Sequence, residues 1–407
     1  AGALNSQRLL AYCPRATSQT YGMARAFLKV WRQSSCSLMF NWMSLIVNRS
    51  LKTPVLTSPL KGRIAIATFL LGLFLAGLSP YVFAIDPSSH IDRALALSPN
   101  DGYGFLQLCT RAGDDRVARG PSKAQRMQRK IPPPAKAFDN LYFIGSHWTH
   151  AWALTTSAGI IIFDAMDNAW QAEHIIHAGL IELGLDPASI KYIIVSHGHW
   201  DHYGGAKYLQ DFATAPDGTG ARVVMSEIDW QMIEAKKPIK PRPGRSAPPP
   251  MDMSVSDGDQ IVLGDTTVKI VATPGHTMGT ISPIFSVYDG TAEHRVMLWG
   301  GSSFNFGSDK PQQLQAYIES TQRAKVLARE YGVDTLISNH ALYDRAIDKL
   351  GLMSRNVDSG NLFVLGQQSV ATTFDVIEAC AKATLTKWQA EAQPLLTRIV
   401  NSSSELE

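Results

Sequence analysis

The stretch HGHWDH, residues 197–202, follows an apolar run and places three imidazoles and one carboxylate within a few positions. In a tight turn that leaves a strand, His197 and His199 point the same way and can share one ion. Asp201 and His202 lie one step further along and can reach a second ion. Imidazole nitrogens and carboxylate oxygens suit zinc, and the stretch contains no sulfur ligand that would favour copper or an iron-sulfur cluster. The sequence therefore predicts a metal site, and the spacing favours two ions.

Further ligands are expected downstream, because a catalytic zinc needs three protein ligands and an open position for water. The segment TPGHT, residues 273–277, follows an alternating apolar stretch. Its Pro-Gly pair interrupts the strand and leaves His276 on a loop. His340 also comes just after a short apolar strand. Either histidine alone would be an ordinary surface or core residue, but strand-end loops that deliver ligands to one rim indicate a shared site.

The pattern S-H-x-H-x-D-H-x-G-G followed by T-P-G-H-T resembles the metallo-β-lactamase superfamily over about residues 138–345. It most resembles the β-lactamase subclass with three histidines at one zinc and Asp-His-His at the other. Carried over residue by residue, the resemblance implies the following ligands. The first zinc is held by His197, His199 and His276, and the second by Asp201, His202 and His340.

One position separates the possible relatives within the superfamily. Glyoxalase II, the tRNA 3′-processing nucleases and many lactonases carry a metal-bridging Asp within the region of residues 298–303, where this chain has Gly301. The other β-lactamase subclasses have a Cys ligand nearby, and none is present here. The resemblance therefore implies the all-histidine subclass, with Ser302 or Ser303 available to contact a substrate carboxylate.

Two loops are expected to shape the pocket. Residues 145–152 leave a strand where related enzymes have a flexible wall over the zincs, so Trp148 is a candidate substrate contact, whereas Trp152 fits a packed aromatic turn better. Residues 236–245 form a basic, Pro-rich excursion that could attract an anionic substrate. A solvated loop without a role explains this second segment equally well.

The periodicity of the chain indicates a mixture of strands and helices. The resemblance turns this into an expected α/β fold, a four-layer αββα sandwich. Short strands are predicted at 141–144, 153–156 and 159–164, a second β-rich half at 260–304, and helices at 170–183, 311–331 and 370–388.

Composition sets limits on the class of protein. The chain has 407 residues, of which 45% are hydrophobic and 18% charged, which is ordinary for a globular protein. Residues 1–84 contain nine Lys or Arg and no acidic residue, so the remainder has 29 basic and 35 acidic residues, a net charge of −6. A protein that cleaves nucleic acid would be expected to carry a basic footprint, so nucleic acid is not the expected partner.

Residues 1–84 are typical of a leader. A basic stretch precedes the uncharged apolar run 64–78, and the segment ends in small residues, as in a secretory signal, so the mature chain is expected to begin near Ile85. A membrane anchor, an organellar transit peptide and translation from an internal Met43 are alternatives. We expect export to the bacterial periplasm, with no stable membrane insertion once the leader is removed.

The remainder divides into an N-terminal extension at 85–137, expected to wrap the core, and a hydrolase domain at 138–407 that ends in a helix. It contains Cys109 and Cys380, one before and one after the catalytic core. In an oxidising compartment they could pair, but two buried thiols are equally compatible with the sequence.

The expected function follows from the site. Two zinc ions would give a metal-bound hydroxide near neutral pH, with Asp201 orienting it, and this hydroxide would open a cyclic amide, most simply a β-lactam. A lactone or ester hydrolase on the same site is the main alternative, followed by a non-catalytic zinc-binding protein. The expected partner is a small-molecule substrate, and the sequence leaves the oligomeric state open.

Overall fold

The first sheet has seven strands in the order β1 to β7. Strands β1 to β4 are antiparallel, and β4 to β7 are parallel. The computed structural model describes residues 86–98, 103–117, 119–215, 218, 220–237, 239, 242–355 and 360–404. The strands are β1 (Ala135–Phe138), β2 (Leu141–Gly145), β3 (His150–Thr156), β4 (Gly159–Phe163), β5 (Ile190–Ile194), β6 (Arg222–Ser226) and β7 (Met253–Val255).

The second sheet has five strands in the order β12-β11-β10-β9-β8. Within this sheet the edge pair, β11 and β12, is parallel, and the other described pairs are antiparallel. Its strands are β8 (Gln260–Leu263), β9 (Thr266–Lys269), β10 (Ile284–Asp289), β11 (Ala292–Trp299) and β12 (Thr335–Ser338).

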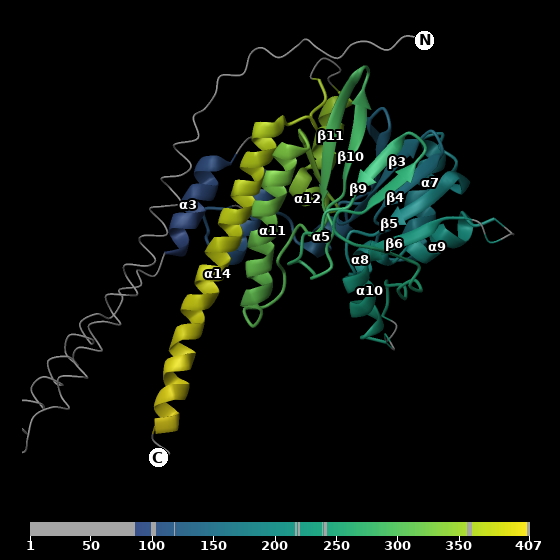
Figure 1. Ribbon diagram of the computed structural model, residues 1–407. Coiled ribbons are helices and arrows are strands. Elements are labelled where there is room, and N and C mark those ends of the chain that lie inside the picture. The colour runs from purple at the N-terminus through teal and green to yellow at the C-terminus, as the bar shows by residue number, and fades with distance from the viewer. Residues whose placement is uncertain are drawn as a thin grey trace, which may run out of the picture. The chain divides into compact units, whose positions relative to one another are not determined.

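Helices cover the outer face of each sheet (Figure 1). The first sheet is covered by α6 (Ala169–Gln171), η2 (Ala172–His177), α7 (Ala178–Glu182), α9 (Ala206–Phe212) and α10 (Glu227–Glu234). The second is covered by α11 (Pro311–Glu330) and α14 (Gln367–Ser404). Short helical segments are α3 (Pro87–Leu97), α4 (Tyr103–Leu106), η1 (Gln107–Ala112), α5 (Lys123–Met127), η3 (Pro187–Ser189), α8 (Trp200–Tyr203), α12 (Ala341–Asp344) and α13 (Ala346–Met353).

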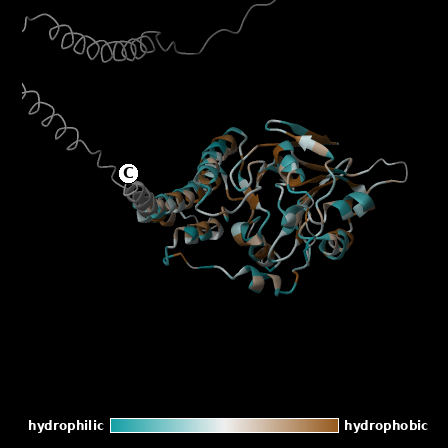
Figure 2. Ribbon diagram, turned by 90° about the horizontal axis from the view of Figure 1, so that it is seen from below, coloured by the Kyte–Doolittle hydropathy of each residue, from teal (hydrophilic) through white to brown (hydrophobic). Residues whose placement is uncertain are grey.

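Three apolar clusters hold the layers together, and alternation along the strands explains them. In β4, Ile160 and Ile162 pack against helices, whereas Ile161 and Phe163 face the second sheet, where the Phe163 ring stacks on Phe285 at 4.7 Å between centroids. A third cluster lies between the second sheet and α11 and α14. In Figure 2 hydrophobic (brown) and hydrophilic (teal) residues alternate along the helices, as expected for helices with one buried face. Three interfaces define four layers, which confirms the αββα sandwich.

The N-terminal extension, which was predicted as a segment that wraps the core, contains several helices. Helix α3 begins at Pro87, with the Asp86 side chain accepting the Ser88 N–H at 3.0 Å as its N-cap. Ile91 and Phe105 are buried in the cluster that also contains α11 and α14. The extension thus completes the outer layer of the second sheet, and the first strand already begins at Ala135 rather than after the predicted boundary at 138.

The two mature cysteines form a disulfide. Cys109 in η1 is bonded to Cys380 in α14, and both are fully buried. The bond joins residues 271 positions apart, so it restrains most of the described chain in the unfolded state. The sequence was compatible with either a disulfide or two buried thiols, and the structure contains the disulfide.

Reduction of this disulfide is expected to lower the free energy of unfolding by about 2–5 kcal/mol, because a bond that closes a long loop restricts the unfolded chain strongly. Denaturant unfolding with and without reductant measures the loss. Mass spectrometry of alkylated peptides checks the pairing: Cys109 and Cys380 should react only after reduction. Alkylation of both residues in the native protein without reductant would contradict the assignment.

The predicted leader, including its apolar run at 64–78, lies outside the described residues. Within the described residues, α14 is the longest helix at 38 residues. Neither α14 nor any other described helix combines the length and the apolar character needed to cross a membrane.

Candidate metal centre

The six predicted ligands come together at one edge of the sandwich. The turn after β5 carries His197 and His199, and α8, which begins at the next residue, carries Asp201 and His202. The second sheet supplies the other two, on the loop after β9 and directly after β12. Strand ends of both sheets therefore deliver ligands to the same place, as the sequence predicted.

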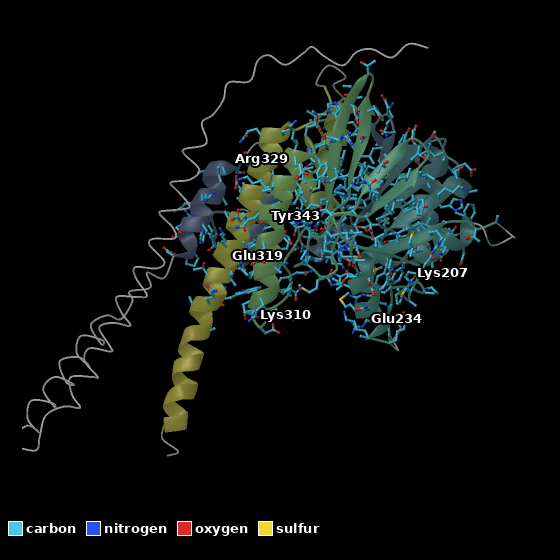
Figure 3. The ribbon with its side chains drawn as sticks, viewed as in Figure 1. Lys207, Glu234, Lys310, Glu319, Arg329 and Tyr343 are labelled. Atoms are coloured by element: carbon cyan, nitrogen blue, oxygen red, sulfur yellow. A yellow bond between two sulfur atoms is a disulfide. The ribbon has the colours of Figure 1, made fainter. Side chains whose placement is uncertain are left out.

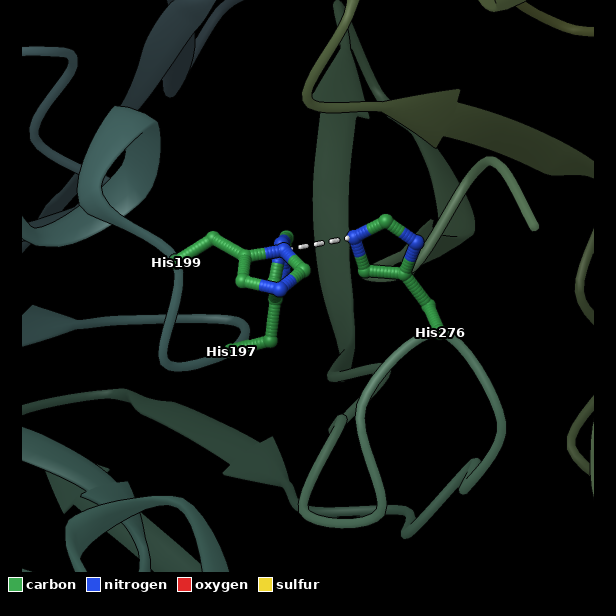
Figure 4. Close-up of side chains that lie close together, drawn as sticks. All are labelled: His197, His199 and His276. Carbon is green, nitrogen blue, oxygen red and sulfur yellow. Dashed lines mark hydrogen bonds between the residues drawn. The ribbon is translucent and has the colours of Figure 1, made fainter. Parts of the chain in front are cut away.

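His197, His199 and His276 form the first group, whose candidate ligand atoms all lie within 4.8 Å of one another. Figure 4 shows one nitrogen of His199 and one nitrogen of His276 pointing toward each other, with His199 Nδ1 3.0 Å from His276 Nε2. Two nitrogens bound to one tetrahedral zinc at 2.0–2.1 Å would lie about 3.3 Å apart. The spacing of this pair therefore fits one shared zinc ion.

Asp201, His202 and His340 form the second group, with the same 4.8 Å limit on the candidate ligand atoms. The His202 ring lies 5.0 Å from the His340 ring and 4.1 Å from the His197 ring, measured between centroids. The two groups are therefore adjacent, as a dinuclear centre requires.

Hydrogen bonds on the far side of the second group fix which nitrogen is free. His340 Nδ1 donates to the Trp148 carbonyl at 2.9 Å, since a carbonyl can only accept. His202 Nδ1 donates to the Asp164 carboxylate at 2.7 Å. In both rings Nε2 is then left for an ion. His202 Nε2 is buried and has no hydrogen-bond partner in the described part of the chain.

A similar arrangement holds the first group. His276 Nδ1 donates to the Ser303 carbonyl. Ser196 Oγ donates to Asp164 at 2.9 Å, so it accepts from His197 Nδ1 at 3.0 Å. His197 Nε2 is buried without a hydrogen-bond partner among the described residues. Each group therefore contains one buried imidazole nitrogen without a hydrogen-bond partner among the described residues. A metal ion bound by the lone pair of this nitrogen would compensate for the missing hydrogen bond, so the residues fit a metal site.

Burial keeps most of these rings in the form that binds metal. It lowers the pKa of His276 to about 4 and the pKa values of His199 and His340 to about 3, so these imidazoles are neutral at pH 7. Burial also acts to lower the pKa of His202, but the carboxylates of Asp164 and Asp201 outweigh it and raise the pKa.

Asp164 positions both groups. It follows β4 with φ +60°, which is uncommon for a residue other than glycine, and its carboxylate accepts from the Ser196 N–H, the Ser196 hydroxyl and His202. Asp164 directly follows β4, and its three hydrogen bonds therefore fix the position of the loop after β5 relative to β4.

Asp164→Ala is expected to weaken zinc binding at the second group by about 10–100-fold, because His202 loses the acceptor that orients its ring. Competition with a chromophoric chelator measures this affinity. The matched control is Asp334→Ala, which removes the acceptor of His294 Nδ1 at 2.7 Å in a pair outside the centre. Equal zinc affinity of the two variants would contradict the role given to Asp164.

Asp229, in α10, connects the two loops that carry the first group. Its buried carboxylate accepts the Gly198 N–H at 2.6 Å, the Thr277 hydroxyl at 2.6 Å and the Gly279 N–H at 3.2 Å. Gly275, on the second of these loops, has φ +141°, and its Cα approaches the Tyr317 backbone so closely that a Cβ would lie 2.5 Å from Tyr317 Cα. The loop geometry thus depends on one carboxylate and one glycine.

The position of the absent bridging aspartate is closed to any side chain. A Cβ on Gly301 would lie 2.5 Å from His276 Cβ and 2.9 Å from Thr280 Cγ2. Glycine is therefore required where the ligand loop crosses the end of the second sheet.

The three predicted substrate contacts have different positions. A pocket of about 90 Å³ opens onto both groups and includes Trp148 and Ser303 in its wall. Ser302 is instead turned into the core, where its hydroxyl contacts Ser338 Oγ and lies 3.2 Å from Asn339 Oδ1. The expectation that Ser302 contacts substrate is therefore corrected. Trp152 is fully buried and donates to the Ser338 carbonyl at 2.9 Å, so it is a packing residue as expected.

The sequence analysis missed the cations of this pocket. Arg111 and Arg126 line it, and Lys123 lines a groove of about 550 Å³ that shares His199, Asp201 and His276 with the centre. Lys310, which precedes α11, lines the same groove and is labelled in Figure 3. The capping box of Ser122 and Gln125 in the sequence could have predicted that a helix, α5, begins here and carries Lys123 and Arg126.

Fold and site together define a metal-binding αββα sandwich. Residues 149–286 match the family model of the metallo-beta-lactamase superfamily. The resemblance seen in the sequence is thereby confirmed.

Two curated relatives are hydroxyacylglutathione hydrolases. The one from Maricaulis maris is 39% identical over 93 residues, which are 23% of this chain and 28% of the relative. The one from Cereibacter sphaeroides is 24% identical over 131 residues, which are 32% of this chain and 43% of the relative. The chain thus spans less than half the length of these relatives.

A solved structure supports the fold. A mutant of the metallo-beta-lactamase FEZ-1 from Legionella gormanii superimposes with a TM-score of 0.51 at 20% identity, over 65% of this chain and 97% of that one. At this identity the likeness concerns the fold.

Proposed function

We propose that this protein is a hydrolase dependent on two zinc ions that opens a cyclic amide, a β-lactam. The observation that carries the proposal is the pair of adjacent three-residue groups, each with a buried imidazole Nε2 that lacks a partner in the described part of the chain. Zinc bound there lowers the pKa of a water molecule and polarises a carbonyl, so the chain needs no serine or cysteine nucleophile.

The chain's own residues supply orientation and proton acceptance. Burial acts to raise the pKa of Asp201, but the neighbouring imidazoles of His202 and His340 outweigh it and lower this pKa to about 2. The Asp201 carboxylate is therefore ionised at neutral pH and accepts a hydrogen bond from the attacking water. The narrow pocket and the ring of Trp148 keep other water away from the reacting carbonyl.

A lactam is favoured by the residue at position 301. A bridging aspartate of the kind found in thioester, phosphodiester and many lactone hydrolases is replaced by Gly301, whose surroundings admit no side chain. Ser303 lies in the pocket, and its buried hydroxyl has no hydrogen-bond partner among the described residues. It is therefore free to bind a polar group of the substrate.

A lactone or ester hydrolase on the same centre is the second candidate. It is favoured by the sequence matches to hydroxyacylglutathione hydrolases. The zinc site and the role of Asp201 would be the same in both reactions.

Turnover assays on the zinc-loaded full chain separate the two candidates. A chromogenic cephalosporin and a carbapenem are compared with acyl lactones and aryl esters. The proposal expects kcat/KM above about 10⁴ M⁻¹ s⁻¹ for a lactam, within the ordinary enzyme range. Efficient lactone or ester turnover with only trace lactam activity would transfer the assignment to the second candidate.

We also propose that the protein is exported, to the periplasm if the source is bacterial. The support is the Cys109–Cys380 disulfide, since such bonds persist in oxidising compartments and are rare in the cytosol. The amino-terminal sequence of protein isolated from the periplasmic fraction tests this: export expects a start near Ile85.

A further inference from the structure

A second cavity, which we name the side cavity, lies between the N-terminal extension and the helices that follow the last metal ligand. Its volume is about 330 Å³, and none of the six metal-ligand candidates lines it. Its walls come from the extension between residues 104 and 129, from His147 in the loop after β2, and from residues 341–348 of α12 and α13. Pockets for small molecules begin at about 300 Å³. The side cavity is therefore large enough for a small ligand of its own.

Close contacts hold the walls of the side cavity in place. Gly104 lies against α12, where a Cβ would be 2.1 Å from the Tyr343 carbonyl oxygen. The ring of Phe105 stacks on Tyr343 with 5.8 Å between centroids. The Gly120 N–H donates to Gln107 Oε1 at 2.6 Å, which ties two lining segments of the extension together. The side cavity is thus a fixed feature of the packing between the extension and α12.

The lining of the side cavity is basic. Arg126, Arg129 and Arg345 line it, and Asp348 is the carboxylate in its described lining. Arg345 Nε pairs with Asp348 at 3.3 Å. In the part of the chain that the structure describes, neither Arg126 nor Arg129 takes part in an ion pair. Two positive charges therefore lack a counter-ion from the described residues.

Arg126 also lacks an acceptor. Its Nε is buried and has no hydrogen-bond partner among the described residues. Burial lowers the pKa of Arg126, and the nearby charge of Arg129 lowers it further, whereas Tyr343 acts in the opposite direction. A buried donor without an acceptor has lost its hydrogen bonds to water and gained none in return. An anion beside Arg126 would supply both an acceptor and the missing negative charge.

The backbone at Arg345 is strained. Between α12 and α13 this residue has φ +55°, a left-handed conformation that residues with a Cβ rarely adopt. Such strain persists where the surrounding structure enforces it, and it is concentrated at sites that bind ligands. This turn brings the side chains of Arg345 and Ile347 to the side cavity.

The chemistry of the lining suits a phosphate monoester. Such a group carries about −1.5 to −2 charge at neutral pH and three acceptor oxygens, which matches two arginines without counter-ions. Guanidinium groups bind phosphate through two parallel N–H bonds. Pro121, Leu342 and Ile347 provide apolar wall beside the arginines, so an organic group attached to the phosphate would also find contacts.

We propose that the side cavity is a second ligand site, which binds a small organic phosphate through Arg126, Arg129 and Arg345. The organic part of the ligand lies against Pro121 and Leu342. The inference goes beyond the proposed hydrolysis and does not depend on it, because none of the metal-ligand candidates lines the side cavity.

Isothermal titration calorimetry of the zinc-loaded full chain tests the site with phenyl phosphate, phenyl sulfate and inorganic phosphate. The variant is Arg129→Gln, because Arg129 is exposed and lines the side cavity but not the metal pocket. Arg119→Gln is the matched control, an exposed arginine of the same extension outside the described lining. Arg126 is left unchanged because it lines both spaces. Binding of these anions to zinc is then common to all the proteins compared.

Wild type is expected to bind phenyl phosphate about tenfold or more tightly than phenyl sulfate, which has the same ring but one negative charge, and than inorganic phosphate, which lacks the ring. Arg129→Gln should weaken phenyl phosphate binding by about tenfold or more, and Arg119→Gln should match wild type. Asp348→Asn should tighten binding by about twofold or more, because it removes a like charge and frees Arg345. Damage to the fold would not produce tighter binding.

Equal affinity of wild type and Arg129→Gln for phenyl phosphate would overturn the proposal. Equal affinity of wild type for phenyl phosphate and phenyl sulfate, or for phenyl phosphate and inorganic phosphate, would also overturn it, and so would weaker binding by Asp348→Asn. Should Arg129→Gln fail to fold by circular dichroism, Arg345→Gln decides, with an expected weakening of about threefold or more.

Discussion

Replacing His276 by alanine is expected to lower kcat by more than about 100-fold and to remove one of the two zinc ions. Loss of a residue that only orients a metal ligand costs 10–100-fold in affinity or activity, so loss of a ligand itself costs more. The Nε2 atom of His276 faces His199 Nδ1 at 3.0 Å, and the described residues offer no other side chain in its place in this group. Zinc content and turnover of the purified variant are measured together.

His174→Ala is the control for this experiment. His174 is an exposed histidine on η2 whose ring stacks on Trp170, away from the metal ligands. It should retain two zinc ions and full activity. Recovery of wild-type turnover by His276→Ala under zinc-saturating conditions would contradict the ligand assignment.

Asp229→Ala is expected to lower the free energy of unfolding by about 3–5 kcal/mol. The change leaves the N–H groups of Gly198 and Gly279 and the hydroxyl of Thr277 without their acceptor, and each buried donor left unsatisfied costs about 1–3 kcal/mol. Urea unfolding of the zinc-free protein measures the loss without a contribution from metal binding.

Asp257→Ala provides the comparison. Its carboxylate pairs with Arg323 at 2.7 Å and accepts the Ala272 N–H at 2.8 Å, both on the surface, where an ion pair contributes at most about 1 kcal/mol. If the two variants were equally stable, the carboxylate of Asp229 would not be what holds the two ligand loops together.

Much of the centre could be predicted because its ligands lie next to strand ends. The motif at 197–202 and the TPGHT loop carry their own turn signals, and α11 was predicted at 311–331 and ends at Glu330. Periodicity alone indicated only mixed α and β. The order of the four layers depends on contacts between distant strands, such as Phe163 with Phe285, and came from the resemblance.

The direction of individual side chains was harder to predict. Ser302 and Ser303 are neighbours, yet one faces Ser338 in the core and the other lines the pocket. Residues 301–305 form no regular strand, so alternation gives no basis for assigning their faces. Proximity of Cys109 to Cys380 was likewise beyond the sequence, because it arises from the packing of η1 on α14.

The position of the basic residues beside the metal pocket could not be predicted from composition. Arg111, Lys123 and Arg126 occur in a polar segment where basic residues are usually solvated. Only the fold of the segment around Trp148 and α14 brings these side chains to the metal pocket.

The central claim, a dinuclear zinc centre held by these six residues, is tested most directly by the metal content of the purified full chain. Elemental analysis by mass spectrometry, after dialysis against metal-free buffer, is expected to give close to two zinc ions per chain. The value should fall to zero with a strong chelator and return to two on adding zinc. A value near zero after reconstitution with excess zinc would contradict the account.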